Sequence, residues 1–361
     1  MTDRERFLAC VLGETVDRPP YWLLWDGWAT TLDRWKGEGA DFGLLGEPRL
    51  LFEPENPPVP VPVHFGPHPA FDETLLEETP EWRLYIDPWG VTRREFKTKE
   101  SMPEFVEFPV KNRRDWEQYK EERLNPDAPG RIPDDLRAAL AVWPDLGFPI
   151  QIGNFPDVGI YGGLRWLLGD EECLVAFCTD PDWVHEIMEH LTTLYLTVFA
   201  DVAELMRIDV IHMWEDMCGR NGPLISPRQW EEFIGPCYRR IAEFVKAHDI
   251  PVFSVDTDGQ PELIIPPMMA AGVNYLWPME VAAGCDVNRM RKRYPDLAIM
   301  GGIDKRALAI GPEAIDAEFE RVRPAVESGR YIPDLDHCVP DDVSWENYCY
   351  FAEGLKRLVG R

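Results

Sequence analysis

Residues 251–280 read PVFSVDTDGQPELIIPPMMAAGVNYLWPME, and this stretch decides the predicted fold. It opens on an apolar segment of strand length, Pro251–Val255, and ends on a second one, Val273–Trp277. Gly272 stands directly before the second segment, where the C-terminal cap of a helix belongs. A strand, a helical stretch and another strand in this order are typical of a βαβ unit, in which the two strands run parallel.

The same alternation extends in both directions along the chain. Further apolar segments of strand length are Pro20–Trp25, Pro149–Ile152, Ile208–Trp214, Leu297–Met300 and Tyr331–Leu335. Apolar residues recur at the helical period in Pro181–Met206, Pro227–His248, Glu313–Val326 and Ser344–Leu358. This series predicts a closed (β/α)₈ TIM barrel. A nucleotide-binding Rossmann domain is disfavoured, because no glycine-rich phosphate loop follows any of the predicted strands.

We expect one domain over residues 1–361, with the main run of βα units in residues 131–361. Residues 52–69 (FEPENPPVPVPVHFGPHP) are too rich in proline for a helix or a central strand. Short alternating segments between residues 80 and 120 predict hairpins. We therefore expect about residues 40–130 to form an irregular, hairpin-containing extension that covers the barrel.

The composition excludes several classes of partner. The chain has 37 Lys and Arg against 64 Asp and Glu, which gives a formal charge of −27. Such a chain has no basic face for nucleic acid or for an anionic membrane surface. It has no apolar segment long enough for a membrane span and no secretory signal, so we expect a cytoplasmic protein.

The residues that follow the predicted strands are the candidate site, because barrel active sites lie at the carboxyl ends of the strands. They are Asp26, Asn154, Glu215, Asp216, Asp256, Asp258, Glu280, Asp304, Asp336 and His337. Crowded carboxylates need a cation or must raise their pKa values. This leaves a bound metal, a cationic substrate or protonated carboxyl groups as open alternatives. A simpler alternative for each single residue is a helix cap.

Asp256, Asp258 and His337 are the candidate metal ligands. Alternate residues leaving a strand point the same way, so the two carboxylates can converge, and the last strand of a barrel brings His337 near. This set suits Zn²⁺, Fe²⁺ or Mn²⁺. His337 is otherwise a core or capping residue. Four tryptophans near strand ends, Trp25, Trp28, Trp214 and Trp277, either pack in the core or form walls for a cationic or flat ligand.

Several ordered motifs resemble the uroporphyrinogen decarboxylase superfamily. They are residues 6–20 (RFLACVLGETVDRPP), Ser226-Pro227, residues 301–304 (GGID) and residues 331–340 (YIPDLDHCVP). The resemblance implies a TIM barrel. It also implies either decarboxylation or methyl transfer linked to cobalamin, because the superfamily contains both kinds of enzyme.

Departures from the family pattern favour methyl transfer. True decarboxylases carry arginines after the first strand to hold substrate carboxylates, whereas this chain has Trp25, Asp26 and Trp28 there. An octacarboxylate substrate would be repelled by an acidic mouth. The resemblance also places His337 on the decarboxylases' GHG histidine and Asp87 on their catalytic aspartate. Asp256 and Asp258 match the HxC zinc ligands of thiol-activating methyltransferases in place but not in type.

The sequence therefore predicts a methyltransferase that moves a methyl group between a small methylated substrate or a corrinoid and an acceptor such as a folate or thiol. The alternatives are a decarboxylase-type lyase on a porphyrinogen or smaller acid, and a non-catalytic corrinoid-binding partner. We expect the catalytic residues to be His337, Asp258 and Glu215. The expected substrate-binding residues are Trp25, Asp26, Trp28, Asn154, Trp214, Trp277, Glu280 and Asp336.

The expected cofactors follow from the resemblance. They are a corrinoid (cobalamin) carried by a partner protein, or tetrahydrofolate, and a divalent metal such as zinc held by Asp256, Asp258 and His337. We also expect a small-molecule substrate and a homodimer, with no nucleic acid and no membrane as a partner.

Overall fold

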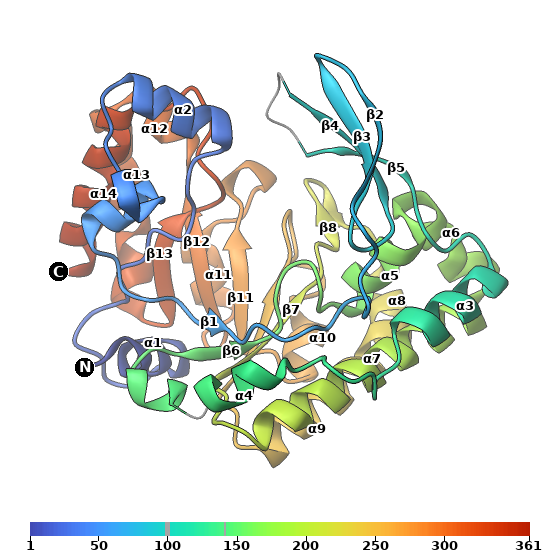
Figure 1. Ribbon diagram of the computed structural model, residues 1–361. Coiled ribbons are helices and arrows are strands. Elements are labelled where there is room, and N and C mark those ends of the chain that lie inside the picture. Colours follow the sequence, from blue (N-terminus) through green and yellow to red (C-terminus); the bar gives the residue numbers. More distant parts are fainter. Residues whose placement is uncertain (98–101, 141) are drawn as a thin grey trace.

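The computed structural model describes residues 1–97, 102–140 and 142–361, and its centre is a curled sheet of parallel strands in the order β1-β6-β7-β10-β11-β12-β13 (Figure 1). The strands are β1 (Val59–Pro60), β6 (Ile150–Ile152), β7 (Val210–Trp214), β10 (Val252–Asp256), β11 (Tyr275–Met279), β12 (Ala298–Ile303) and β13 (Tyr331–Leu335). Helices connect the strands and cover the outer side of the sheet (Figure 1). The predicted (β/α)₈ TIM-barrel class is confirmed, and so are all six strands predicted from residue 149 onward.

The predicted first strand, Pro20–Trp25, is different, because it lies extended between the two ends of the sheet without forming a ladder. The amide of Leu24 donates to a carboxylate oxygen of Asp334 on β13 (2.8 Å), and the carbonyl of Tyr21 accepts from the amide of Glu55 (2.9 Å). A single parallel bridge joins Gly27 to Val339. This segment therefore occupies the eighth barrel position through side chains and isolated contacts.

The proline-rich stretch explains why no ladder forms between β1 and the segment Pro20–Trp25. Val59 and Val61 donate their amides to the carbonyls of Pro149 (2.9 Å) and Gln151 (2.8 Å) along β6. The positions between the valines are prolines, including Pro60, and amides at alternate positions face the opposite side. Proline has no N–H, so β1 offers few hydrogen-bond donors toward the segment Pro20–Trp25.

Helices form in the four segments with a helical period and in several segments for which no helix was predicted. They are α1 (Asp3–Leu12), α2 (Ala29–Gly37), α3 (Arg113–Arg123), α4 (Asp134–Leu140), α5 (Ile160–Leu168), α6 (Asp170–Thr179), α7 (Pro181–Ala203), α8 (Pro227–Gln229), α9 (Gly235–Ala247), α10 (Ile265–Ala270), α11 (Val287–Arg293), α12 (Arg306–Ile310), α13 (Pro312–Ser328) and α14 (Trp345–Val359). A π turn, Trp230–Ile234, joins α8 to α9. Ser226 begins α8 with a capping box to Gln229, and the Ser344 side chain caps α14. Among the described residues, none of these helices is both long and apolar enough to cross a membrane.

A second, antiparallel sheet stands beside the carboxyl ends of the barrel strands (Figure 1). Its strands are β2 (Thr74–Glu78), β3 (Trp82–Ile86), β4 (Thr92–Phe96) and β5 (Glu104–Glu107). This is the region for which alternating segments predict hairpins, apart from residues 98–101, which lie outside the described residues. The sheet gives one side of the barrel mouth a wall that the βα units alone do not supply.

Candidate functional site

The candidate site lies at the carboxyl ends of the parallel strands, where residues distant in sequence meet. His337 follows β13 and Asp258 follows β10, and their Nε2 and Oδ2 atoms are 3.7 Å apart. Both side chains remain partly accessible, at 23% and 37% of their surface. The structure thus brings together two of the three residues predicted to be catalytic.

A row of aromatic rings runs from the rim into the barrel through His337. The His337 ring stacks on Trp25 with centroids 4.7 Å apart and lies nearly parallel to Trp28 at 6.4 Å. Trp25 meets Trp277 at 6.2 Å, and Trp277 stacks on His212 at 5.0 Å. Except for the buried His212, these rings are half-buried, so the row presents apolar ring faces to the mouth.

The inner end of this row is fixed by hydrogen bonds. Trp277 Nε1 donates to Ser254 Oγ (3.0 Å), and the same hydroxyl lies 3.1 Å from His212 Nδ1. Burial lowers the pKa of His212 to about 3, so its imidazole is neutral at physiological pH. A neutral ring stacked on Trp277 makes His212 a structural support for the row.

Burial and mutual repulsion raise the pKa values of the carboxyl groups after β10. The pKa of Asp258 rises to about 7, through burial first and then the charges of Asp216 and Glu280. The pKa of Asp256 rises well above its usual value through burial and the charge of Asp258. The pKa of His337 falls to about 4, through burial and the nearby Lys305 cation. Near neutral pH the imidazole of His337 is therefore neutral, and Asp256 and Asp258 hold a proton more readily than ordinary carboxyl groups do.

The candidate metal ligands do not form a preorganised site. Among the residues that the structure describes, no group of three His, Cys, Asp or Glu side chains lies close enough to hold an ion. Asp256 and Asp258 instead respond to burial and crowding with raised pKa values, whereas the pKa of His337 is lowered. These residues do not fit a three-ligand metal centre in this arrangement.

Glu215 directs its carboxylate into the protein. Its two oxygens accept from the backbone amides of Ile160, Tyr161 and Gly162 at 2.7–2.9 Å and from the hydroxyl of Tyr238 at 2.8 Å. It is fully buried. Glu215 thus caps the N-terminus of α5 from a neighbouring strand, which is where its negative charge is favoured.

Two other predicted acids also bind backbone amides. Asp336 accepts from the amides of Val281 (3.0 Å) and Lys305 (3.1 Å), and Glu280 accepts from the amide of Gly259 (2.7 Å). These bonds tie the loops after β10, β11, β12 and β13 to one another. The two side chains therefore shape the mouth, while Glu280 keeps part of its surface accessible.

Asn154 and Trp214 lie on the side of the mouth below the antiparallel sheet. The Asn154 side chain is exposed, and Trp214 is buried between the rings of Phe155 (4.7 Å) and Trp166 (5.7 Å). Neither is part of the row of rings at His337. The four tryptophans thus divide into three in the row and one in the neighbouring core.

Basic side chains enter the mouth from segments that the sequence reasoning did not connect to it. Arg49 lies 3.6 Å from Asp26, and Arg165 on α5 binds Asp216 (2.7 Å). Lys305 lowers the pKa values of Asp258 and His337 through its charge. Lys305 could have been found, because it follows β12 directly, whereas Arg49 and Arg165 carry no such signal in the sequence.

Asp26 is the least satisfied acid at the rim. Burial raises its pKa to about 6 despite the neighbouring Arg49 cation. Its Oδ1 atom and the Nε1 atom of Trp25 are buried without a hydrogen-bond partner among the described residues. Buried polar atoms that lack partners, here on two consecutive residues, are typical of places where a ligand or a water completes the bonding.

Asp87, which the family resemblance places at a catalytic position, lies in the turn between β3 and β4. One of its oxygens accepts from the amides of Trp89 and Val91, each at 2.9 Å. The other forms an ion pair with Arg93, and the residue is buried. Both oxygens of the carboxylate are therefore bonded to residues of the same hairpin.

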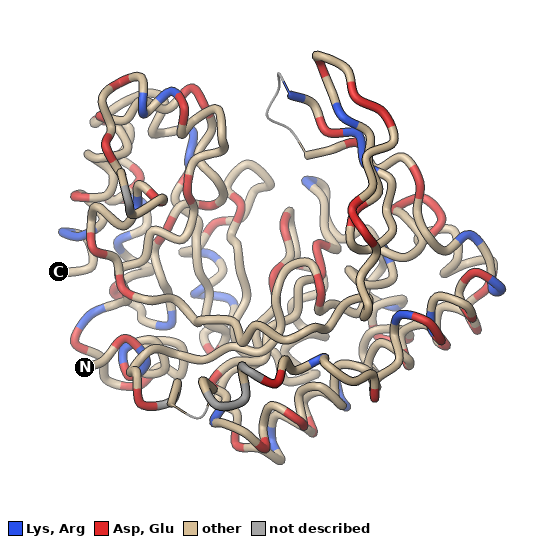
Figure 2. Tube along the Cα trace, viewed as in Figure 1, with Lys and Arg blue, Asp and Glu red and all other residues tan. Residues whose placement is uncertain are grey.

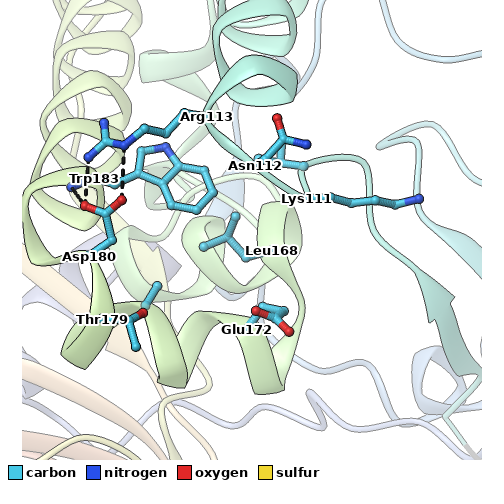
Figure 3. A pocket seen from close by; sticks show the side chains of 10 residues that line it. Lys111, Asn112, Arg113, Leu168, Glu172, Thr179, Asp180 and Trp183 are labelled. Carbon is cyan, nitrogen blue, oxygen red and sulfur yellow. Dashed lines mark hydrogen bonds and ion pairs between the residues drawn. The ribbon is translucent and has the colours of Figure 1, made fainter.

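Pockets in the surface occur both at the mouth and away from it. One of about 230 Å³ at the rim is lined in part by Asp258 and Glu280. Another, of about 450 Å³, lies between the start of α3 and helices α6 and α7 (Figure 3). There Arg113 pairs with Asp180 (2.7 Å) and lies over the ring of Trp183 (5.9 Å). The pair of Arg113 and Asp180 neutralises two of the charges at this pocket, which lies away from the carboxyl ends of the barrel strands where the candidate site is.

Comparisons with known proteins agree with this architecture. The chain is 21% identical over 375 residues to a uroporphyrinogen decarboxylase from Prochlorococcus marinus subsp. pastoris, covering 98% of this chain and 97% of that protein. It is 22% identical over 380 residues to one from a Synechococcus species, covering 98% and 96%. A solved methyltransferase from Methanosarcina mazei superposes with a TM-score of 0.63 over 99% of both chains, at 15% identity. That likeness shows the fold.

The family model described as uroporphyrinogen decarboxylase (URO-D) matches residues 169–358. This match covers more than half of the 361 residues and includes every strand from β7 to β13. The chain therefore belongs to the uroporphyrinogen decarboxylase family.

Proposed function

We propose that this protein is a methyltransferase that moves a methyl group between a small methylated substrate or a corrinoid and an acceptor such as a folate or thiol. Members of this superfamily are enzymes. The observation that carries the proposal is the row of half-buried rings that meets Asp258 at His337. Ring faces exclude water from a methyl group, and nearby carboxylates favour a donor atom that carries positive charge.

His337 and Asp258 would manage the proton in this reaction. As the methyl carbon bonds to the acceptor, its bond to the donor breaks and the donor keeps the electron pair. A proton must then leave the acceptor or reach the donor, and His337 and Asp258, which lie 3.7 Å apart, would relay it through one bridging water or after closing to hydrogen-bond distance. Trp25, Trp28 and Trp277 would form the wall that orients the methyl group, since orientation carries much of the rate gain.

The remaining predicted residues take supporting roles in this proposal. Glu215, whose hydrogen bonds all lie within the protein, positions α5 and the start of the loop that carries Asp216. Glu280 and Asp336 hold the loops at the rim, and Asp26 completes the wall beside Trp25. A corrinoid or tetrahydrofolate would enter as co-substrate at the same mouth, and no step of the proposal requires a metal.

The rival function is decarboxylation of a porphyrinogen or a smaller acid, which the curated relatives favour by their names. Two observations disfavour it. Asp87 is bonded to backbone amides and to Arg93, and Asp26, which stands where decarboxylases carry arginines, pairs with Arg49 and makes it less available for a substrate carboxylate. Incubation with uroporphyrinogen tests the rival directly, because formation of coproporphyrinogen would contradict the methyl-transfer proposal.

The direct test follows methyl transfer by the absorbance change of methylcobalamin in the presence of tetrahydrofolate or a thiol. We expect His337→Ala and Asp258→Ala to lower the rate by about a hundredfold or more, as removal of an acid–base group does. His248→Ala and Asp201→Ala are matched controls, since both residues are exposed and lie outside the mouth. Full activity in both site variants would refute the assignment.

A further inference from the structure

The rim pocket of about 230 Å³ is not used by the proposed chemistry, although it shares Asp258 with the mouth. It lies between the segments that follow β7, β10, β11 and β12. The first of these segments folds back as a small hairpin of β8 (Cys218–Gly219) and β9 (Gly222–Pro223), which carries Arg220 at its tip. Arg220 and Arg306 are the two basic residues that line the pocket.

Most charges around this pocket already have partners. Arg306 forms a bidentate pair with Asp304, with distances of 2.7 and 2.8 Å. Glu280 accepts from a backbone amide, and Asp258 faces His337. Arg220 is the exception, because in the described part of the chain it has no ion pair and no hydrogen bond.

The hairpin that carries Arg220 is held rigidly against the loop after β10. Gln260 donates its amide to the carbonyl of Gly219 (3.0 Å). Gly259 sits at φ +78°, and a Cβ there would approach the carbonyl oxygens of Gly219 and Cys218 to 2.6 and 2.7 Å. Only glycine permits this close contact. The backbone that carries Arg220 is therefore fixed against the loop that carries Asp258, and the Arg220 side chain is exposed at the pocket.

We propose that this pocket binds an anionic group, a carboxylate or a phosphate, with Arg220 as its principal donor. The guanidinium fork matches both groups through two parallel hydrogen bonds. A chain with a formal charge of −27 repels anions, so an anion in this pocket needs an arginine that has no carboxylate partner of its own. The proposal rests on the proposed function in one respect: the anionic group would belong to the methyl donor or acceptor whose reacting end lies at His337.

Calorimetric titration of the full chain with inorganic phosphate, and separately with acetate, at low ionic strength tests this site without turnover. We expect Arg220→Ala to weaken binding by about tenfold, equivalent to about 1.4 kcal/mol. The affinity of Arg220→Lys should lie between those of the wild type and Arg220→Ala, because lysine keeps the positive charge and loses the paired N–H groups of the guanidinium. Glu280→Gln should tighten binding, because it removes a negative charge from the wall.

Arg228→Ala is the matched control, since Arg228 is an exposed arginine on the nearby α8. Unchanged affinity in Arg220→Ala, an equal loss in Arg228→Ala, or weaker binding in Glu280→Gln would each overturn the proposal. Preference for phosphate over acetate, or the reverse, identifies the kind of anionic group. Phosphate or acetate binding that persists in a protein without methyl-transfer activity would reject only the proposed function.

Discussion

The ring of His337 rests against two indoles, and among the described residues it has no hydrogen bond that would fix its orientation. The Asp258 carboxyl group that faces it lies beyond hydrogen-bond distance at 3.7 Å. Stacking on Trp25 is therefore the main restraint on the imidazole. An aromatic pair of this kind contributes about 0.5–1.5 kcal/mol beyond its buried area.

Trp25→Ala should therefore release the imidazole of His337. We expect its ring-proton resonances to lose the ring-current shift from the indole, and methyl transfer to slow by roughly tenfold, which corresponds to about 1.4 kcal/mol. The measurement is an NMR spectrum of histidine-labelled protein beside an activity assay. Trp25→Phe should keep most of both properties, and an unchanged His337 resonance in Trp25→Ala would contradict this account.

At the scale of elements, the close docking of α5 on β7 determines the geometry of one side of the mouth. A Cβ at Gly159 would lie 1.9 Å from the carbonyl oxygen of Trp214, and one at Gly162 would lie 2.4 Å from the same atom. Glycine at both positions lets the helix N-terminus reach the strand end, where Glu215 caps it. Arg165 on the same helix then binds Asp216.

Gly159→Ala should displace α5 and destabilise the protein by about 3 kcal/mol, since the contact is with backbone that cannot move aside. Gly37→Ala is the matched control, because no atom lies within 4 Å of its added Cβ and it ends α2. That substitution should be neutral or stabilise by about 0.5–1 kcal/mol. Urea denaturation of the three proteins measures both effects; equal midpoints for Gly159→Ala and the wild type would show the docking argument to be wrong.

At the scale of the whole molecule, a buried carboxyl group joins the first segment of the barrel, Pro20–Trp25, to the last strand, β13. Asp334 on β13 accepts from the amides of Leu24 and Leu335, each at 2.8 Å, and is fully buried. Burial raises its pKa from 3.8 to about 6. The folded protein therefore holds a proton that the unfolded chain releases between about pH 4 and pH 6.

This linkage makes the stability of the folded protein depend on pH. A raised pKa of the folded state contributes stability that is complete below the unfolded value and is lost as the pH rises through the folded value. The asparagine of Asp334→Asn does not titrate, so only the wild type loses stability as the pH rises. The difference in free energy of unfolding between the wild type and Asp334→Asn should therefore shrink between pH 4 and pH 7, by up to about 3 kcal/mol. Urea denaturation of both proteins at each pH checks this, and a deficit that grows with pH would exclude the mechanism.

The acidic composition also acts at this scale, and acidic positions outnumber basic ones along the chain (Figure 2). The carboxylates at the mouth nevertheless fall into two groups. Glu215, Asp334 and Asp336 are buried and accept hydrogen bonds from backbone amides, whereas the side chains of Asp258 and Asp26 keep accessible surface. Only the second group is available to a substrate.

The sequence by itself determined the barrel and the residues at its strand ends. Apolar segments such as Pro251–Val255 and Val273–Trp277 predicted parallel strands, because burial on both faces leaves a local pattern that needs no knowledge of distant contacts. The position of His337 and Asp258 at the same edge follows from that topology. The helix end at Gly272 was equally readable, since the bonds of a helix end lie within one turn of that helix.

Only the tertiary structure decided which of these residues face a ligand. Glu215 was indistinguishable from Asp258 in the sequence, because both follow a strand, yet one caps α5 and the other borders the mouth. The pairing of Arg49 with Asp26 and of Arg165 with Asp216 joins segments far apart in the chain. Such contacts depend on how helices and loops pack over the strand ends. The residues next to a side chain in the sequence do not indicate which distant residue folding will bring into contact with it.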